Sequence, residues 1–437
     1  MPDVAGFPYI EAEFTVDGTL NPPTQTAAIL AFLRALPGQR DLLVLAHGWN
    51  NDMADARALY RMLLESMRGL LGAAAPGEPA VLGVLWPSKK FADAGLIPGG
   101  GIASTDGDTT ALAAKLDRLR AGLPADRARL LDEAKAALGE LADRRAARTL
   151  FLDRLRRALE RDPAREPDAA DQFFGAEPEG LFASLETPIL LAEPVVPGGG
   201  AGGVGAPDVQ GGGGAAGLGD IATGILAAAD RLVNYATYYQ MKARAGIVGR
   251  GLGQLLDAIR GGCPDLRLHL CGHSFGARVV TAAAQAATMH ARPASLTLLQ
   301  AAFSHNGFSG GFDVAGQAVR GFFRDVISAR KIDGPIVVTH TVNDKAVGIA
   351  YAIASRLARQ NNADLGDADD IYGGLGRNGA IHTAESVAGT LLPPGQRYTL
   401  QSGAIHNLRA DAFIADHGDV ANPACANALL AAIGRQS

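Results

Sequence analysis

Hydrophobic residues along this chain follow two alternating patterns. Short continuous apolar runs, such as residues 42–46, are typical of strands covered on both faces of a sheet. Between them, apolar residues recur every three or four positions, which is typical of amphipathic helices. The pattern predicts strands at residues 11–16, 42–46, 81–86, 266–271, 295–301, 336–341 and 397–402, and helices at 24–36, 54–71, 226–259, 277–289, 317–329, 346–359 and 423–433. This alternation predicts an α/β protein with a mostly parallel central sheet and helices on both faces.

The alternation is interrupted between residues 90 and 220. Residues 112–159 carry apolar positions at helical spacing, with Pro124 near a helix start, and predict two or three amphipathic helices. Residues 198–219 are mostly Gly and Ala and predict a flexible linker or a mobile loop. We therefore expect a core formed by residues 1–89 and 221–437, with residues 90–220 as a helical and Gly-rich insertion that caps it.

Composition narrows the classes of protein to consider. The chain has 437 residues, 48% of them hydrophobic, and its 40 basic and 45 acidic side chains leave a net charge of −5. That is ample material for one large core, and the charge balance does not favour a nucleic acid as partner. Three cysteines without a CxxC pair predict neither a disulfide framework nor a thiolate metal site. Because we find no long apolar run and no export signal, we expect a cytoplasmic protein without a membrane segment.

The strongest candidate for chemistry is Ser274, in the sequence Gly272-His273-Ser274-Phe275-Gly276. A buried strand is predicted before it and a helix after it, which is the context of a nucleophile elbow. The flanking glycines are expected where side chains would collide with the neighbouring strand and helix. The turn places the hydroxyl above the carboxyl edge of the sheet, beside a helix N-terminus that favours an anion. We therefore predict that Ser274 is a nucleophile.

A serine hydroxyl needs a general base, and the base needs an acid that orients it. With this kind of elbow, the acid and then the base follow the serine along the chain. Asp344 directly follows the strand predicted at residues 336–341 and is the candidate acid, with helix N-capping as its alternative or additional role. His406 and His417 both follow the last predicted strand. We favour His417 as the base because its loop has the longer reach back over the sheet edge.

An oxyanion is stabilised by backbone N–H donors. Phe275 follows the nucleophile and Trp49 follows an early predicted strand, so these two residues are the candidate donors, and Trp49 is also a candidate wall of the acyl pocket. The other candidate substrate-binding residues are His47, Gly48, Asn50, His273 and His305. Among these, Gly48 allows close backbone approach, His273 has a structural role in the elbow as its alternative, and His305 ends a predicted strand.

The candidate residues lie in four segments: Leu45-Ala46-His47-Gly48-Trp49-Asn50, Cys271-Gly272-His273-Ser274-Phe275-Gly276-Ala277-Arg278, Asn343-Asp344-Lys345-Ala346-Val347 and His417-Gly418-Asp419. Together they resemble the motifs of bacterial α/β-hydrolases of the esterase/lipase superfamily. The resemblance spans most of both core regions and leaves out residues 90–220. It implies an α/β-hydrolase fold, a Ser274–Asp344–His417 triad and an oxyanion hole at Trp49 and Phe275. Phe275 stands where many relatives carry Leu, Met or Gln, which alters the shape of the pocket but not the chemistry.

These observations predict a serine hydrolase that cleaves carboxylic esters through an acyl-enzyme. The insertion, with the apolar stretch 188–196, favours a lipid-like or polyester substrate. An amidase, thioesterase or acyltransferase would use the same triad, and a binding protein would keep only the fold, so these alternatives stay open. We expect no cofactor and no metal. Two Gly-x-Gly-x-x-Gly sequences, starting at Gly212 and Gly374, lack the strand before and the helix after that a dinucleotide site requires.

Overall fold

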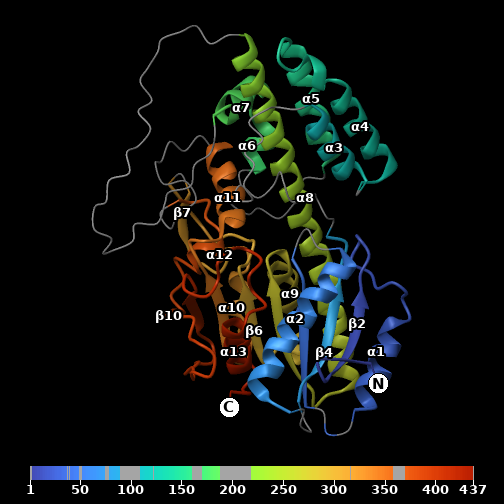
Figure 1. The fold of residues 1–437 in the computed structure, drawn as a ribbon, viewed down its shortest axis with the longest axis vertical. Helices are drawn as coiled ribbons and strands as arrows, with labels where there is room; N and C mark the ends of the chain where they lie inside the picture. The colour runs from blue at the N-terminus through green and yellow to red at the C-terminus, as the bar shows by residue number, and fades with distance from the viewer. Residues whose placement is uncertain are drawn as a thin grey trace.

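The structure, a computed structural model, describes residues 2–36, 38, 40–48, 52–73, 78–88, 109–121, 123–159, 170–187, 218–314, 316–357 and 370–436. Within these residues, nine strands form one sheet in the order β1-β2-β4-β3-β5-β6-β9-β11-β10 (Figure 1). Only the β1–β2 pair is antiparallel. The strands are β1 (Asp3–Val4), β2 (Phe7–Glu13), β3 (Asp41–Ala46), β4 (Ala80–Leu85), β5 (Arg267–His273), β6 (Ser295–Leu299), β9 (Ile336–His340), β10 (Ser386–Thr390) and β11 (Ile405–Arg409). The predicted α/β class with a mostly parallel sheet is confirmed.

Helices cover both faces of the sheet. Successive side chains of a strand point to opposite sides, so each strand contributes side chains to two cores. In β3, Leu42 and Val44 belong to one hydrophobic core, with α1, α8 and α9, whereas Leu43 and Leu45 belong to a second core, with α2 and α13. These helices are α1 (Gln25–Arg34), α2 (Met53–Leu71), α8 (Leu218–Gly262), α9 (Phe275–Ala286) and α13 (Pro423–Ala432). Two covered faces favour apolar side chains at successive positions of a strand, which explains the continuous apolar run at residues 42–46.

The direction in which the chain adds strands reverses between β3 and β5. From β3 the chain passes through α2 to β4 on one side, and from β5 it passes through α9 to β6 on the other side. The two connections therefore diverge at the carboxyl ends of neighbouring strands. Open α/β sheets bind ligands in the crevice that such a switch point leaves. His47 follows β3 and Ser274 follows β5, so both lie at this point.

A group of helices lies beyond the carboxyl ends of the strands, beside the long helix α8 (Figure 1). The group consists of α3 (Thr109–Arg120), α4 (Ala125–Ala136), a 3-10 turn (Leu138–Glu140), α5 (Arg145–Ala158), α6 (Ala170–Gly175) and α7 (Pro178–Leu185). Helix α7 contacts both α8 and α11 (Lys345–Leu357), and Lys115 in α3 forms an ion pair of 2.6 Å with Asp230 in α8. The helices predicted within residues 112–159 are confirmed. The apolar stretch 188–196 and most of the Gly-rich stretch 198–219 lie outside the described residues.

Two predicted elements are wrong, and one is displaced. Residues 397–402 form no strand; their apolar side chains pack on the second core from a loop, and the last strand is β11. The helix predicted at 317–329 divides into β8 (Gln317–Val319), which pairs with β7 (Phe312–Val314), and the short α10 (Arg324–Ser328). Gly321 lies between the two elements. A Cβ there would lie 2.3 Å from the carbonyl oxygen of Asn306, so this close approach of the backbone requires a glycine. The strand expected at residues 11–16 is β2, which starts and ends earlier.

Candidate active site

Ser274 occupies a strained turn between β5 and α9. Its φ of 55° and ψ of −123° lie in a region that residues with side chains seldom adopt, at a cost of about 1–3 kcal/mol. The turn is possible because Gly272 and Gly276 have no side chains. A Cβ on Gly272 would lie 2.4 Å from the backbone of Gly276, and a Cβ on Gly276 would lie 2.1 Å from the carbonyl oxygen of Ala46. The glycines of the elbow therefore stand where the sequence analysis expected them to be needed.

The neighbouring strand β6 holds the backbone of Ser274 in this conformation. The Ser274 N–H donates to the carbonyl of Leu299 at 3.0 Å, and the Ser274 carbonyl accepts from the N–H of Ala302 at 3.1 Å. Leu299 is the last residue of β6, and Ala302 lies in the chain that follows it. The strained turn is thus fixed by the sheet and by the glycine contacts.

Ser274, His417 and Asp344 form a continuous chain of hydrogen bonds. The Nε2 of His417 lies 2.9 Å from Ser274 Oγ, and its Nδ1 lies 2.8 Å from Asp344 Oδ2. Asp344 has a fully buried side chain, Ser274 is 3% exposed, and the imidazole of His417 is 20% exposed. The three residues that the sequence analysis selected are therefore brought together from the ends of β5 and β9 and from the loop after β11.

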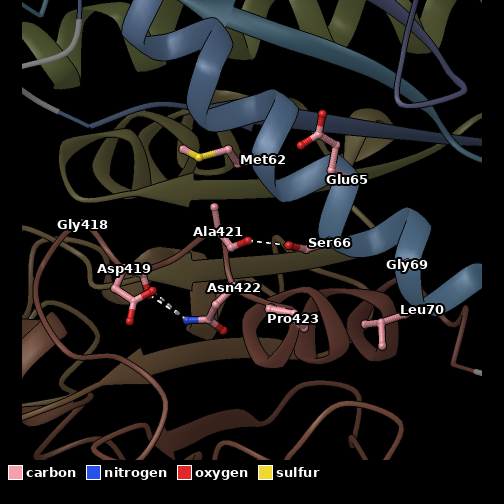
Figure 2. A pocket seen from close by; sticks show the side chains of 10 residues that line it. All are labelled: Met62, Glu65, Ser66, Gly69, Leu70, Gly418, Asp419, Ala421, Asn422 and Pro423. Atoms are coloured by element: carbon pink, nitrogen blue, oxygen red, sulfur yellow. Dashed lines mark hydrogen bonds between the residues drawn. The ribbon is translucent and has the colours of Figure 1, made fainter.

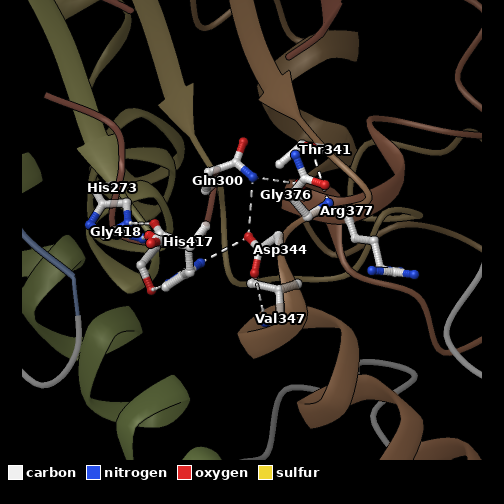
Figure 3. A network of polar contacts seen from close by, with 12 residues as sticks. His273, Gln300, Thr341, Asp344, Val347, Gly376, Arg377, His417 and Gly418 are labelled. Atoms are coloured by element: carbon white, nitrogen blue, oxygen red, sulfur yellow. Dashed lines mark hydrogen bonds and ion pairs between the residues drawn. The ribbon is translucent and has the colours of Figure 1, made fainter. Parts of the chain in front are cut away.

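The carboxylate of Asp344 also accepts two bonds from groups that do not titrate. Its Oδ1 accepts from the N–H of Val347 at 2.9 Å, as the side chain of a helix N-cap does. Its Oδ2 accepts from Nε2 of Gln300 at 3.2 Å (Figure 3). Both roles considered for Asp344 in the sequence analysis thus occur together. Gln300 was not predicted from the sequence, where it is visible only as an amide beside an apolar run and nothing local connects it to Asp344.

His417 is suited to take up a proton. Burial by itself would lower the pKa of His417, but the charge of Asp344 and the hydrogen bond to it outweigh burial and raise the pKa above its ordinary value. The Nδ1–H donated to Asp344 leaves the Nε2 lone pair directed at the Ser274 hydroxyl. The imidazole is therefore held in the tautomer that a general base requires.

His273 connects the elbow to the loop that carries His417. Its Nε2–H donates to the backbone carbonyl of His417 at 2.8 Å, and the two rings lie 4.9 Å apart (Figure 3). Burial lowers the pKa of His273 to about 3, so the ring is neutral near pH 7. This supports the structural role that was the alternative for His273, because its donor is used inside the protein.

Gly48 packs directly on the nucleophile. A Cβ at Gly48 would lie 2.7 Å from Cβ of Ser274, so only glycine allows this approach. His47 supports the turn: its Nδ1 lies 3.0 Å from the carbonyl oxygen of Gly48, its Nε2 accepts from the N–H of Trp86 at 3.3 Å, and burial lowers its pKa to about 4. Trp49 and Asn50 lie outside the described residues, so their predicted roles stay predictions.

Phe275 is the first residue of α9, and its side chain is buried in the core. The Phe275 ring packs on the ring of Tyr238 in α8, with 5.2 Å between the ring centres. The hydroxyl of Tyr238 donates to that of Tyr351 in α11 at 2.8 Å. The first N–H groups of a helix point out of its N-terminal end, where the helix dipole favours negative charge. The Phe275 amide belongs to this end of α9, and its predicted role as an oxyanion donor stays a prediction.

Two other candidate histidines lie in separate surroundings. His305 is fully buried. Its backbone N–H donates to the carbonyl of Gly373, and its imidazole Nδ1 lies 3.0 Å from Nδ2 of Asn378. His406 lies within β11, where its Nε2 accepts from the N–H of Gln401 at 2.9 Å. None of these three bonds involves a triad residue. Of the two histidines considered as the base, His417 is the one that meets Ser274.

A groove of 720 Å³ flanks the loop that carries His417 (Figure 2). One wall is α2, from Met62 to Leu70, and the other is the chain from Gly418 to Pro423. The Ser66 hydroxyl joins the two walls by donating to the carbonyl of Ala421 at 2.6 Å. No triad residue lines this groove, so it is not where Ser274 would meet a substrate.

The part of the chain that the structure describes contains no group of three or more His, Cys, Asp and Glu residues that could hold a metal ion. None of its helices combines the length and the apolar character needed to cross a lipid bilayer. Comparison of the chain with protein-family models, with curated proteins and with solved structures found no match.

Proposed function

We propose that this protein is a serine hydrolase that cleaves carboxylic esters through an acyl-enzyme. The observation that carries the proposal is the hydrogen-bonded chain from Ser274 through His417 to the buried Asp344, at a strained elbow between a strand and a helix. The mostly parallel sheet and the chain order of the three residues support an α/β-hydrolase fold. Geometry and roles, rather than sequence position, identify such a triad.

In the first half of the reaction, Ser274 Oγ attacks the ester carbonyl carbon while His417 Nε2 takes the hydroxyl proton. Asp344 stabilises the imidazolium that forms. The amide of Phe275 donates to the carbonyl oxygen as it becomes negative, and Trp49 is the proposed second donor. The bond from the carbonyl carbon to the alcohol oxygen then breaks, and the alcohol leaves with the proton from His417.

In the second half, His417 Nε2 removes a proton from water, whose oxygen attacks the acyl carbon. The bond to Ser274 Oγ breaks, Oγ regains the proton from His417, and the carboxylic acid leaves. The acyl group is transferred first to Ser274 Oγ and then to water. Neither transfer changes an oxidation state, so the reaction balances without a cofactor.

The helices beyond the strands are proposed to cap this site. Helix α11 begins directly after Asp344 and contacts α7, while Tyr238 of α8 packs on Phe275 beside the nucleophile. Helices α7 and α8 are therefore anchored against elements that carry the triad. An apolar acyl group is the substrate half that we expect such a cap to enclose.

The rate should depend on pH through His417. Because the charge of Asp344 raises the pKa of His417, the imidazole becomes protonated at a higher pH than an ordinary histidine, whose pKa is about 6.5. A protonated imidazole cannot take the Ser274 proton, so kcat/KM should fall as the pH drops, with a midpoint above 6.5. Ester hydrolysis measured from pH 5 to 9 checks this, and a rate that stays flat through pH 6 would contradict the assigned base.

A substrate panel tests the proposed reaction. We expect p-nitrophenyl esters with acyl chains of increasing length to be cleaved much faster than the matching p-nitroanilides, with release of free carboxylic acid. Faster cleavage of anilides or of acyl thioesters would replace ester hydrolysis with that chemistry on the same triad. If the folded protein cleaves none of them, the proposal of an acyl-transfer enzyme fails.

A further inference from the structure

Gln300 directly follows the strand β6. The neighbours of β6 in the sheet are β5, which leads to Ser274, and β9, which leads to Asp344. Gln300 lies between Leu299 and Ala302, the two residues whose backbone groups bond to the backbone of Ser274. Gln300 is fully buried, and its φ is 45°. A glycine would adopt this backbone without strain. The glutamine at this position therefore carries backbone strain, and it supplies a side-chain amide that a glycine would lack.

The hydrogen-bonding network fixes the orientation of that amide. Its Oε1 accepts from the hydroxyl of Thr339 at 3.0 Å. Its Nε2 donates to the carbonyl of Gly376 at 3.0 Å and to Oδ2 of Asp344 at 3.2 Å. The reversed orientation would direct the amide oxygen at two acceptors, so only the nitrogen can face Asp344.

The oxygen that Gln300 contacts is the one that His417 contacts. Oδ2 of Asp344 thus receives one N–H from a group that titrates and one from a group that does not (Figure 3). A neutral donor holds a buried carboxylate in its charged form without adding charge of its own. It also withdraws part of the negative charge that the imidazole of His417 feels.

We propose that Gln300 is a positioning residue of the triad, which directs Oδ2 of Asp344 toward His417 and moderates how strongly that carboxylate holds a proton on the imidazole. This inference rests on the proposed function, because it gives Gln300 a part in the same reaction. Gln300 acts through Asp344 and touches neither Ser274 Oγ nor a reacting atom. Its effect should therefore appear in the titration of His417 as well as in the rate.

The test replaces Gln300 by methionine, which has a similar length and no N–H donor. With the donor removed, Asp344 should hold the imidazolium more strongly, so the pKa of His417 should rise. It is measured from the imidazole resonances in an NMR titration of protein labelled with ¹⁵N-histidine and assigned with His417→Ala. The less firmly oriented carboxylate should lower kcat roughly 10- to 100-fold while KM changes little. A His417 pKa that is unchanged or lower in Gln300→Met would overturn the inference.

A matched control is Gln285→Met. Gln285 is partly buried, whereas Gln300 is fully buried, and it likewise donates from Nε2 to a backbone carbonyl, that of Phe322, at 3.0 Å. We expect this substitution to change neither the His417 titration nor kcat by more than about twofold. If it changes both as much as Gln300→Met does, the effect belongs to the loss of a buried amide in general, and the positioning role is rejected.

A second variant guards against misfolding of Gln300→Met. Thr339→Val keeps the shape of the side chain in β9 and removes the hydroxyl that fixes the Gln300 amide from the other side. The His417 pKa should again rise, by less than in Gln300→Met, because the amide loses its bond to Thr339 and donates less firmly to Asp344. No change in this variant would contradict the inference. The NMR titration needs no turnover, so it tests Gln300 even if wild-type protein cleaves no ester, an outcome that would refute only the proposed function.

Discussion

His417→Ala should lower kcat for a p-nitrophenyl ester by about 10⁶-fold, the loss known for removing the histidine of a serine triad. His406→Ala should leave kcat within about tenfold of the wild-type value. The reason is the position of the two rings. His417 bridges Ser274 and Asp344 at 2.9 and 2.8 Å, whereas the Nε2 of His406 is bonded to the backbone of Gln401.

The measurement is the initial rate per mole of folded enzyme, with far-UV circular dichroism and a thermal melt for each variant. These controls matter because His406 lies inside β11 and its loss can affect folding. Equal losses in the two folded variants would remove His417 from its assigned role. A large loss in His406→Ala alone would make the other histidine the base.

Ser274→Ala should lower kcat by a similar factor, about 10⁶-fold, because the attacking oxygen is removed. The remaining rate should stay about 10³- to 10⁴-fold above the reaction in water, since donors to the carbonyl oxygen and substrate binding persist. The substitution keeps Cβ, and the hydroxyl bonds to His417, so the free energy of unfolding should change by no more than about 1.5 kcal/mol.

The matched control for this variant is Ser184→Ala. Ser184 is partly buried, and its hydroxyl donates to the carbonyl of Leu181 within α7 at 2.8 Å. We expect its kcat to stay within about twofold of the wild-type value. A Ser274→Ala protein that keeps more than a tenth of the wild-type kcat would show that another group attacks the ester.

Local sequence was enough to predict the elements that carry the nucleophile. The apolar run that became β5, the glycines at 272 and 276 and the helical pattern after them are adjacent in the chain, and each constrains the others. The same holds for β3 and Gly48, where a short strand is followed by a turn that packs on Ser274. In both places the backbone contact that decides the geometry involves a glycine, which leaves a visible trace in the sequence.

The base illustrates where local pattern fails. Tyr398 and Leu400 are spaced as in a strand, yet they pack on the second core from a loop, and the true last strand contains His406. The spacing of apolar residues favours the wrong segment, because Tyr398 and Leu400 alternate with polar residues, whereas the apolar side chains of β11 are only Ile405 and Leu408. His417 meets Ser274 because the chain after β11 returns across the sheet edge, where His273 binds its carbonyl.

Gln300 could not be assigned from the sequence for a different reason. Its amide reaches Asp344 only because β6 and β9 are neighbours in the sheet, although 44 positions separate the two residues along the chain. Its partner Thr339 lies in β9 itself, and its partner Gly376 comes from a third segment. A role that depends on three segments meeting has no periodic signature.

The most direct test of the account is covalent labelling of the folded protein with a fluorophosphonate probe, followed by mass spectrometry of the digested protein. We expect one phosphonylated peptide that contains Ser274, absent in Ser274→Ala and formed far more slowly in His417→Ala. Labelling should also slow at acid pH, as His417 becomes protonated. An unlabelled wild-type protein, or equal labelling of Ser274→Ala, would contradict the assignment of Ser274 as the nucleophile.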